Sequence, residues 1–209
     1  SLSSLSYAQR KMNEMGINNV KLIQMDILEV HLLEEKFDII ECCGVLHHME
    51  DPMKGLKSLL GVLRDNCFLN LGLYSELARE EIISARRIIK EQNIDSSEEN
   101  IRNFRQKIIT SDFSSLNSLK TYGDFYSLSE FRDLCFHVQE HRFTIKQIKN
   151  ILFSNKLKFL GFQLRQPLKS LYKNCFPDDE KQINLDNWEL FEEKYPTTFR
   201  GMYQFWVSK

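Results

Sequence analysis

The chain predicts an α/β fold, in which helices cover both faces of a mostly parallel sheet. Over residues 1–74, short apolar runs bounded by turn residues alternate with amphipathic stretches, as in buried parallel strands joined by helices. A strand signal then returns twice near the C-terminus, and these two strands are expected to form an antiparallel pair at the edge of the same sheet. Strict alternation of helix and strand is typical of a parallel sheet with crossover connections.

The first part begins with apolar side chains at helical spacing over residues 4–15, and Gly16 follows as the expected helix stop. Residues 20–26 alternate like a strand that ends in the carboxylate of Asp26. A short connection with helical character is expected over residues 31–36. The elements that follow are expected as strand, helix and strand over residues 37–43, 52–63 and 67–74.

The rest of the chain divides into a helical insertion over residues 75–155 and a C-terminal part over residues 156–209. The insertion lacks strand signals, and the balanced charges of its first two helices predict solvated faces. Its helices are expected over residues 76–91, 98–109, 131–138 and 145–154, with caps at Ser127 and Thr144 and a loop over residues 111–120. In the C-terminal part, strands are expected over residues 157–164 and 199–207, around a second insertion at 167–195 with a helix near 188–195.

The composition excludes several classes of partner. The 209 residues have a formal net charge of −1, which gives no general attraction to nucleic acid or to an anionic membrane. No apolar run approaches the roughly 18 residues that span a bilayer. The five cysteines are odd in number and form no CxxC pair, so we expect them to be reduced and buried in a reducing compartment such as the cytoplasm.

One stretch, residues 37–51, organises this prediction. Its apolar strand breaks at Gly44 and passes through the pair His47-His48 into Asp51, which with the following proline is typical of a helix start. The loop therefore lies at the carboxyl end of a parallel strand. Open α/β sheets bind their ligands at that edge.

This stretch resembles class I S-adenosylmethionine-dependent methyltransferases. The resemblance rests on three strings, Gln24-Met25-Asp26-Ile27, Phe37-Asp38-Ile39-Ile40 and Gly44-Val45-Leu46-His47-His48, followed by Asp51-Pro52. It implies a partial Rossmann-like cofactor-binding core over residues 1–74, completed by the C-terminal strands. It also implies transfer of a methyl group from S-adenosylmethionine to an acceptor, which the sequence leaves open among small molecules, proteins and glycans.

The resemblance assigns cofactor roles to five residues. Asp26 would accept a hydrogen bond from the adenine amino group, and Ile27 would offer a backbone N–H and an apolar edge to the ring. Cys43, Gly44 and Val45 would line the methionine end of the cofactor, where glycine permits a close approach or a positive φ. The alternative for Asp26 is a cap on the turn that follows it.

Two histidines are candidate catalytic residues. Histidine is suited to proton transfer near neutral pH, so His47 or His48 could accept a proton from the methyl acceptor. In the family that the chain resembles, such a pair also occurs as a packing feature of the loop.

The chain departs from the family at its start. It contains no G-x-G turn, and the acid that binds the ribose hydroxyls would precede Ser1. We therefore expect the first two strands to be missing and the chain to be an incomplete fragment that is inactive alone. The alternative is a non-catalytic binding module built on a degenerate methyltransferase fold.

Residues 124–144 resemble an insertion of some bacterial methyltransferases and are candidates for a substrate lid or pocket wall. The polar residues proposed to contact the substrate are Tyr126, His137, Glu140, His141 and Arg142. Plain structural packing is an alternative. His137 and His141 are also four residues apart, which on a helix would allow both rings, with Glu140, to bind one metal ion; we predict no metal.

Overall fold

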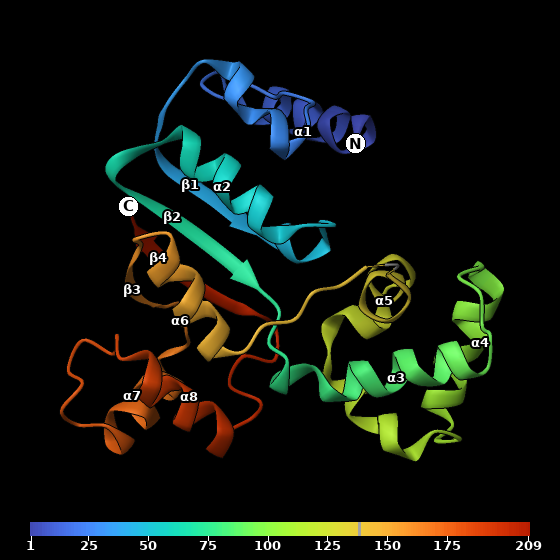
Figure 1. Ribbon diagram of the computed structural model, residues 1–209. Helices are drawn as coiled ribbons and strands as arrows, with labels where there is room; N and C mark the ends of the chain where they lie inside the picture. The colour runs from blue at the N-terminus through green and yellow to red at the C-terminus, as the bar shows by residue number, and fades with distance from the viewer. Residues whose placement is uncertain (138) are drawn as a thin grey trace.

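The computed structural model describes residues 1–137 and 139–209, and it forms an α/β structure around one four-stranded sheet (Figure 1). The strand order is β1-β2-β4-β3, with bounds Phe37–Cys43, Leu63–Leu73, Tyr203–Ser208 and Lys158–Phe162 in that order. β1 and β2 are parallel, whereas β4 is antiparallel to both β2 and β3. The predicted α/β class and the antiparallel pair of C-terminal strands are confirmed.

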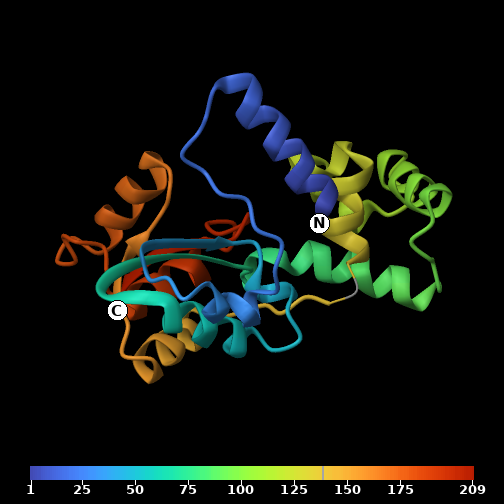
Figure 2. The ribbon, with the colours of Figure 1, turned by 90° about the horizontal axis from the view of Figure 1, so that it is seen from above.

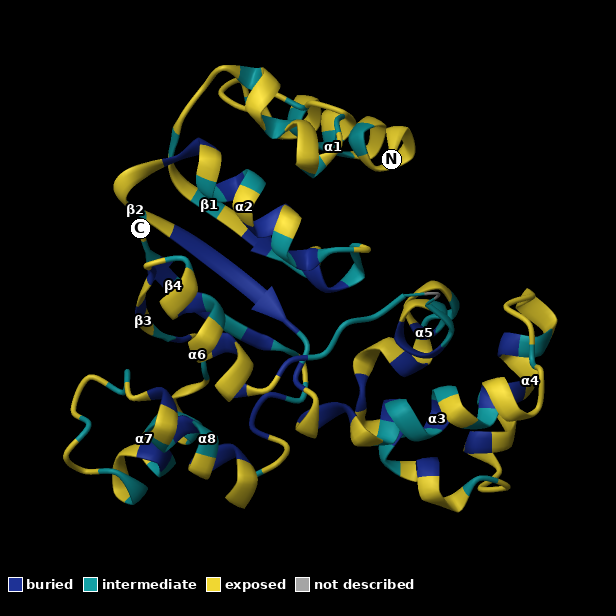
Figure 3. Cartoon of the chain, viewed as in Figure 1, coloured by how far each residue is buried: buried dark blue, intermediate teal, exposed yellow. Residues whose placement is uncertain are grey.

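The N-terminal segment stands apart from the sheet. α1 spans Leu2–Met15 and ends at Gly16, which takes the left-handed φ of 68° expected of a helix stop. No residue of α1 is buried, and Figure 3 shows this helix as mostly exposed. The predicted strand at residues 20–26 is wrong, because this segment runs in irregular conformation and pairs with no described strand. A strand needs a partner for its backbone hydrogen bonds, and alternation in the sequence cannot supply one.

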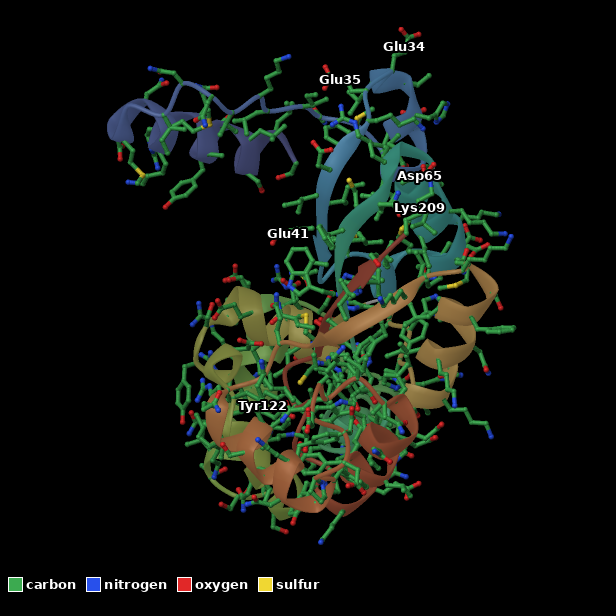
Figure 4. The ribbon with its side chains drawn as sticks, turned by 90° about the vertical axis from the view of Figure 1, so that its left-hand side faces the viewer. Glu34, Glu35, Glu41, Asp65, Tyr122 and Lys209 are labelled. Carbon is green, nitrogen blue, oxygen red and sulfur yellow. The ribbon has the colours of Figure 1, made fainter. Side chains whose placement is uncertain are left out.

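The connection into the sheet is helical, as expected, but earlier and tighter than predicted. It forms a 3₁₀ helix, η1, over Ile27–Leu33. The outer edge of β1 has no partner among the described residues, and Ile39 on this strand is 59% exposed. Figure 4 shows Glu41 of β1 pointing away from β2.

β2 is one of the two interior strands of the sheet, and its second half, Leu69–Leu73, is buried. It follows directly on α2, Pro52–Val62, which Asp51 caps. The Asp51 side chain accepts hydrogen bonds from the backbone amides of Met53 and Lys54. The strand begins at Leu63 rather than at the predicted Cys67, because Leu63 pairs with Phe37 at the start of β1. α2 and α6 lie on the same face of the sheet (Figures 1 and 2).

A separate helical region follows the carboxyl end of β2 (Figure 1). Its elements are η3 Leu77–Arg79, α3 Glu80–Glu91, α4 Glu98–Ile109, η4 Ser114–Thr121, η5 Gly123–Tyr126 and α5 Leu128–Phe136. They enclose an apolar cluster of their own, which includes Ile82, Ile101, Phe104, Leu116, Phe125 and Phe131. α3 and α4 have the expected solvated charged faces, and each also buries a stripe of apolar residues in this cluster.

Two boundaries in this region also differ from the prediction. The expected loop at residues 111–120 contains η4, whose Leu116 and Leu119 are buried. The cap at Ser127 is confirmed, but α5 starts at once and ends at Phe136. The predicted helix end at Val138 lies outside the described residues.

The C-terminal part returns to the sheet and builds the larger apolar core. α6, Ile145–Ser154, has the predicted bounds and a capping box in which Thr144 and Gln147 satisfy each other's backbone amides. The second insertion holds two helices, α7 Gln166–Cys175 and α8 Leu185–Lys194, of which only the second was expected. They join through the stacked rings of Tyr172 and Trp188, whose centroids lie 3.7 Å apart.

Two further expectations can be compared with the structure. No helix in the described part of the chain has the length and apolar character needed to cross a membrane. All five cysteines are free. Cys42 and Cys135 are buried as expected, whereas Cys43, Cys67 and Cys175 are only half-buried.

Candidate functional site

The candidate site lies at the carboxyl end of β1, where the chain turns at Gly44. Gly44 has a φ of +78°, in the left-handed region that favours glycine, and its amide donates to the carbonyl oxygen of Gly72 at 3.4 Å. A Cβ built on Gly44 would meet no atom within 4 Å, so the space beside this turn is open. Gly72 is different, because a Cβ there would come within 2.8 Å of the Cα of Cys43. Glycine at position 72 thus lets β2 approach β1 closely beneath the turn.

The residues after Gly44 form a short 3₁₀ helix, η2, over Leu46–His48. Val45 remains 43% exposed beside the open space, whereas Leu46 anchors the turn in the core at 1% exposure. The predicted methionine-side residues Cys43, Gly44 and Val45 therefore lie together at the carboxyl end of β1, beside the open space at Gly44.

His47 is completely buried at the end of this turn. Its ring stacks on Tyr74, with centroids 3.6 Å apart and an angle of 20° between the planes. Burial, together with the nearby His48 and Arg79, lowers the pKa of His47 to about 3. Neither ring nitrogen has a hydrogen-bond partner among the described residues. A neutral, enclosed ring of this kind favours the packing interpretation over proton transfer.

His48 is half-buried and is held by the segment that follows the helical region. Its Nδ1 lies 3.0 Å from the carbonyl oxygen of Gln139, so Nδ1 carries the proton and Nε2 keeps its lone pair. The ring of His137 lies 4.0 Å away, centroid to centroid. Burial lowers the pKa of His48, and His137 and Arg79 act in the same direction, whereas the Gln139 carbonyl and Glu140 oppose them. Of the two histidines, His48 is the one that remains a neutral base with access to solvent.

The segment 139–143 binds directly to the histidine turn. The amide of His141 donates to the carbonyl oxygen of His47 at 2.7 Å, and the side chain of Gln139 donates to that of Met49 at 3.2 Å. Four of the five predicted substrate residues, His137, Glu140, His141 and Arg142, are thereby brought to the site.

Glu140 differs from its neighbours because its carboxylate is already engaged. The side chain is 1% exposed and accepts hydrogen bonds from Arg79 at 2.8 and 3.2 Å and from Arg86 at 3.3 Å. Arg142 lies 3.6 Å from the same carboxylate. This buried cluster ties the helical region to the sheet edge.

The fifth predicted substrate residue, Tyr126, is not brought to the site. It lies in the helical region, is 68% exposed, and donates its hydroxyl proton to the carbonyl oxygen of Lys120. The helical spacing proposed for a metal site does not arise either, because α5 ends at Phe136, before His137. Among the described residues, no group of three or more acidic, histidine or cysteine side chains is placed to hold a metal ion.

The two adenine-side candidates lie at the start of η1. Asp26 is exposed and accepts a hydrogen bond from the amide of Leu28 at 2.8 Å, which is the capping arrangement considered as its alternative role. Ile27 is half-buried and packs against the main core. One oxygen of Asp26 remains available to a ligand.

Sequence reasoning missed three residues of this edge. Tyr74 carried a usable signal, because it ends the predicted strand 67–74 at the edge where open α/β sheets bind ligands. Arg79 and Gln139 carried none, since an arginine in a charged helix and a glutamine in a polar loop are ordinary surface residues.

The fold places the candidate site at the carboxyl ends of the parallel strands β1 and β2, the edge at which open α/β proteins bind ligands. Comparison with known proteins identifies the family. Residues 1–152 match the family described as "Methyltransferase domain", and the chain belongs to that family. This confirms the resemblance found in the sequence.

Individual relatives are more distant. An uncharacterized protein of Synechococcus sp. is 29% identical over 177 residues, which cover 79% of this chain and 42% of that protein. Two structures of PKMT2 from Rickettsia typhi, one of them in complex with AdoHcy, superpose on the whole chain with TM-scores of 0.70 and 0.72 at 17% and 16% identity. The chain spans 42% and 43% of those two chains.

Proposed function

We propose that this domain binds S-adenosylmethionine at the Cys43–Val45 turn and takes part in methyl transfer to an acceptor held above His48. Membership of the methyltransferase family supports the class of reaction. The observation that carries the proposal is the left-handed turn at Gly44, which leaves open space at the carboxyl end of β1. The complex of the Rickettsia typhi neighbour with AdoHcy supports the choice of cofactor.

The residues of the turn fit such a ligand. Gly44 adds no side chain to the opening, and Val45 offers an exposed apolar surface beside it. When bound, S-adenosylmethionine would supply an electrophilic methyl group on a sulfonium: an aligned nucleophile would bond to the methyl carbon as the C–S bond breaks and S-adenosylhomocysteine leaves. The protein then has to orient the two partners and exclude water, and such alignment contributes much of the rate enhancement.

We assign His48 as the base that removes a proton from the methyl acceptor, for acceptors that carry one on the attacking atom. Its Nδ1–H is fixed by the Gln139 carbonyl, so the proton of the acceptor would pass to Nε2 as the new bond to the methyl carbon forms. The acceptor can be a small molecule, a protein or a glycan. We further infer a cytoplasmic location, which the five free cysteines support.

Asp26 provides the first test. The Asp26→Ala variant is expected to bind S-adenosylhomocysteine about 10- to 100-fold more weakly than the unaltered protein. The reason is that a hydrogen bond to a charged group contributes about 1.5–3 kcal/mol. Calorimetric titration measures this.

Asp26→Asn separates the two roles of Asp26. Asparagine still caps η1 but lacks the charge, so this variant should keep its thermal stability and still bind more weakly. An unchanged affinity in both variants would remove Asp26 from the cofactor site. Failure of the unaltered protein to bind either S-adenosylmethionine or S-adenosylhomocysteine would favour the non-catalytic binding module.

A further inference from the structure

A cavity of about 420 Å³ lies where the helical region meets the C-terminal part of the chain. Its wall is formed by η3 and the first half of α3, by the start of α6, by α8 and by Tyr203 of β4. Small-molecule sites typically have volumes of about 300–1,000 Å³, so the cavity is large enough for one. Among the described residues that form its wall, none belongs to the turn at residues 43–48. The cavity is therefore separate from the candidate site.

Part of the cavity wall is apolar. Leu77, Ile83 and Ile145 contribute aliphatic side chains, and Leu77 is 39% exposed. Apolar surface in a concave wall favours a ligand with a hydrocarbon part, because both surfaces leave water when they meet. A cavity that combines apolar walls with a few converging polar groups is typical of a ligand site.

The polar part of the wall carries one sign of charge. Five glutamates line the cavity, and none of the described lining residues is a lysine, an arginine or a histidine. Glu76 has a cationic partner in Arg142, at 2.9 Å. In the described part of the chain, no lysine or arginine forms an ion pair with Glu80, Glu189 or Glu193. A cleft lined by charges of one sign concentrates their field and attracts ions of the opposite sign.

The fifth glutamate, Glu192, is buried in the wall of the cavity with 4% exposure. Its two oxygens accept hydrogen bonds from the hydroxyls of Ser75 and Tyr203, each at 2.6 Å. Burial raises the pKa of Glu192 and Glu189 acts in the same direction, whereas the two hydroxyls oppose them. A buried carboxylate normally has a cationic partner, and no described lysine or arginine provides one here. A cation bound in the cavity would supply it.

We propose that this cavity binds a primary alkylammonium group, as carried by polyamines and by lysine side chains. The hydrocarbon chain of such a ligand would pack against Leu77, Ile83 and Ile145, and its ammonium group has three N–H donors for the surrounding carboxylates. An ammonium is a compact point charge, which several separate carboxylates can surround. The inference goes beyond the proposed function, because it requires neither S-adenosylmethionine nor His48.

The first test is a calorimetric titration of the native protein with two probes of equal length. Hexamethylenediamine carries two ammonium groups, and hexanediol has the same hydrocarbon chain without charge. Only the diamine is expected to bind, and salt at about 1 M should weaken its binding because charges are then screened within about 3 Å. Spermidine and an end-blocked peptide with one central lysine are then titrated under the same conditions. The tighter of the two shows whether the ligand is a polyamine or a protein side chain.

A double variant tests whether the bound diamine lies in this cavity. Glu80→Gln combined with Glu193→Gln removes two exposed carboxylates of the wall that form no ion pair, and it should bind the diamine about three- to tenfold more weakly. Glu91→Gln combined with Glu130→Gln removes the same charge from exposed positions outside the cavity and should bind as the unaltered protein does. Thermal unfolding of both preparations should show that they remain folded.

Three results would overturn the inference: no binding of the diamine by the native protein, equal binding of the diol, or equal losses of affinity in the two double variants. Titration with S-adenosylhomocysteine keeps the proposed function apart from this test. Both double variants should bind it as the unaltered protein does, since neither alters the Gly44 turn or Asp26. If the native protein failed to bind S-adenosylhomocysteine but bound the diamine, the proposed function would fail and this inference would stand.

Discussion

The sheet region and the helical region each bury a cluster of apolar side chains, but they do so with different elements. In the sheet region, β2 and β4 bury Leu69, Leu71, Phe205 and Val207 almost completely, and helices pack against them. In the helical region, short helices and 3₁₀ turns enclose a smaller aromatic cluster around Phe104 that does not involve the sheet.

The two regions meet through polar groups rather than through a shared apolar core. Arg79 and Glu140 are 2% and 1% exposed at this junction, and Arg86 joins them from α3. The candidate site lies at the same place, with His47, Tyr74 and Arg79 in one stack. The comparison teaches that the two apolar cores are separate, and that the candidate site lies where polar groups join them.

The most severe way to break this junction is Glu140→Ala. It would leave the buried guanidinium of Arg79 without its carboxylate, and breaking such a buried pair costs about 3–5 kcal/mol of folding stability. Urea unfolding measures the loss. Glu14→Ala removes an exposed ion pair with Lys11 and should change stability little. A similarly small effect of Glu140→Ala would show that the junction does not depend on this charge.

The next largest effect concerns pH. The pKa of His47 in the folded chain is about 3, below its usual value of 6.5. As the pH falls, His47 is therefore protonated in the unfolded chain while it is still neutral in the folded chain. The stability contributed by neutral His47 is thus complete above pH 6.5 and is lost toward pH 3. At pH 5 the loss is about 2 kcal/mol.

His47→Phe keeps a ring against Tyr74 but cannot be protonated. Urea unfolding at pH 7.5 and pH 5 should therefore show a smaller loss of stability in this variant than in the unaltered protein. Identical losses would mean that His47 does not titrate as its burial implies.

The smallest expected effects sharpen the comparison between the two cores. Thr144→Ala removes the cap of α6 in the sheet region, and Ser97→Ala removes that of α4 in the helical region, at about 1 kcal/mol each. Because each region has its own apolar cluster, hydrogen exchange should accelerate mainly in the region that carries the substitution. Uniform acceleration across both regions would show that they unfold as one unit.

Several features were predictable because their causes are local. Thr144 and Ser127 cap helices through their own side chains, Gly16 and Gly44 accept positive φ, and Asp51 starts α2. The apolar runs likewise predicted the strands at residues 37–43, 157–164 and 199–207, but the expected burial of the first is wrong, since Cys42 is the buried residue of β1 and Ile39 is exposed. The family motif at residues 37–51 followed from the same local order.

Other features depended on partners that lie far away in the chain. Residues 20–26 alternate like a strand but have no neighbour to pair with, and β2 is lengthened by its pairing with β1. The helical spacing of His137 and His141 lost its meaning when α5 ended at Phe136. In each case a distant hydrogen-bond partner, or the point at which a helix ends, decided the local structure, and local sequence preference did not.

The sequence by itself determined the fold class, the family and the position of the loop that we propose faces the ligand, because strand and turn patterns depend on neighbouring residues. Only the tertiary structure decided what surrounds that loop. Arg79 is an ordinary residue at its own position, and Glu140 was predicted only as a substrate contact; the two pair where the helical region meets the sheet region. A buried charge must find its partner in space, and no spacing in the sequence specifies that partner.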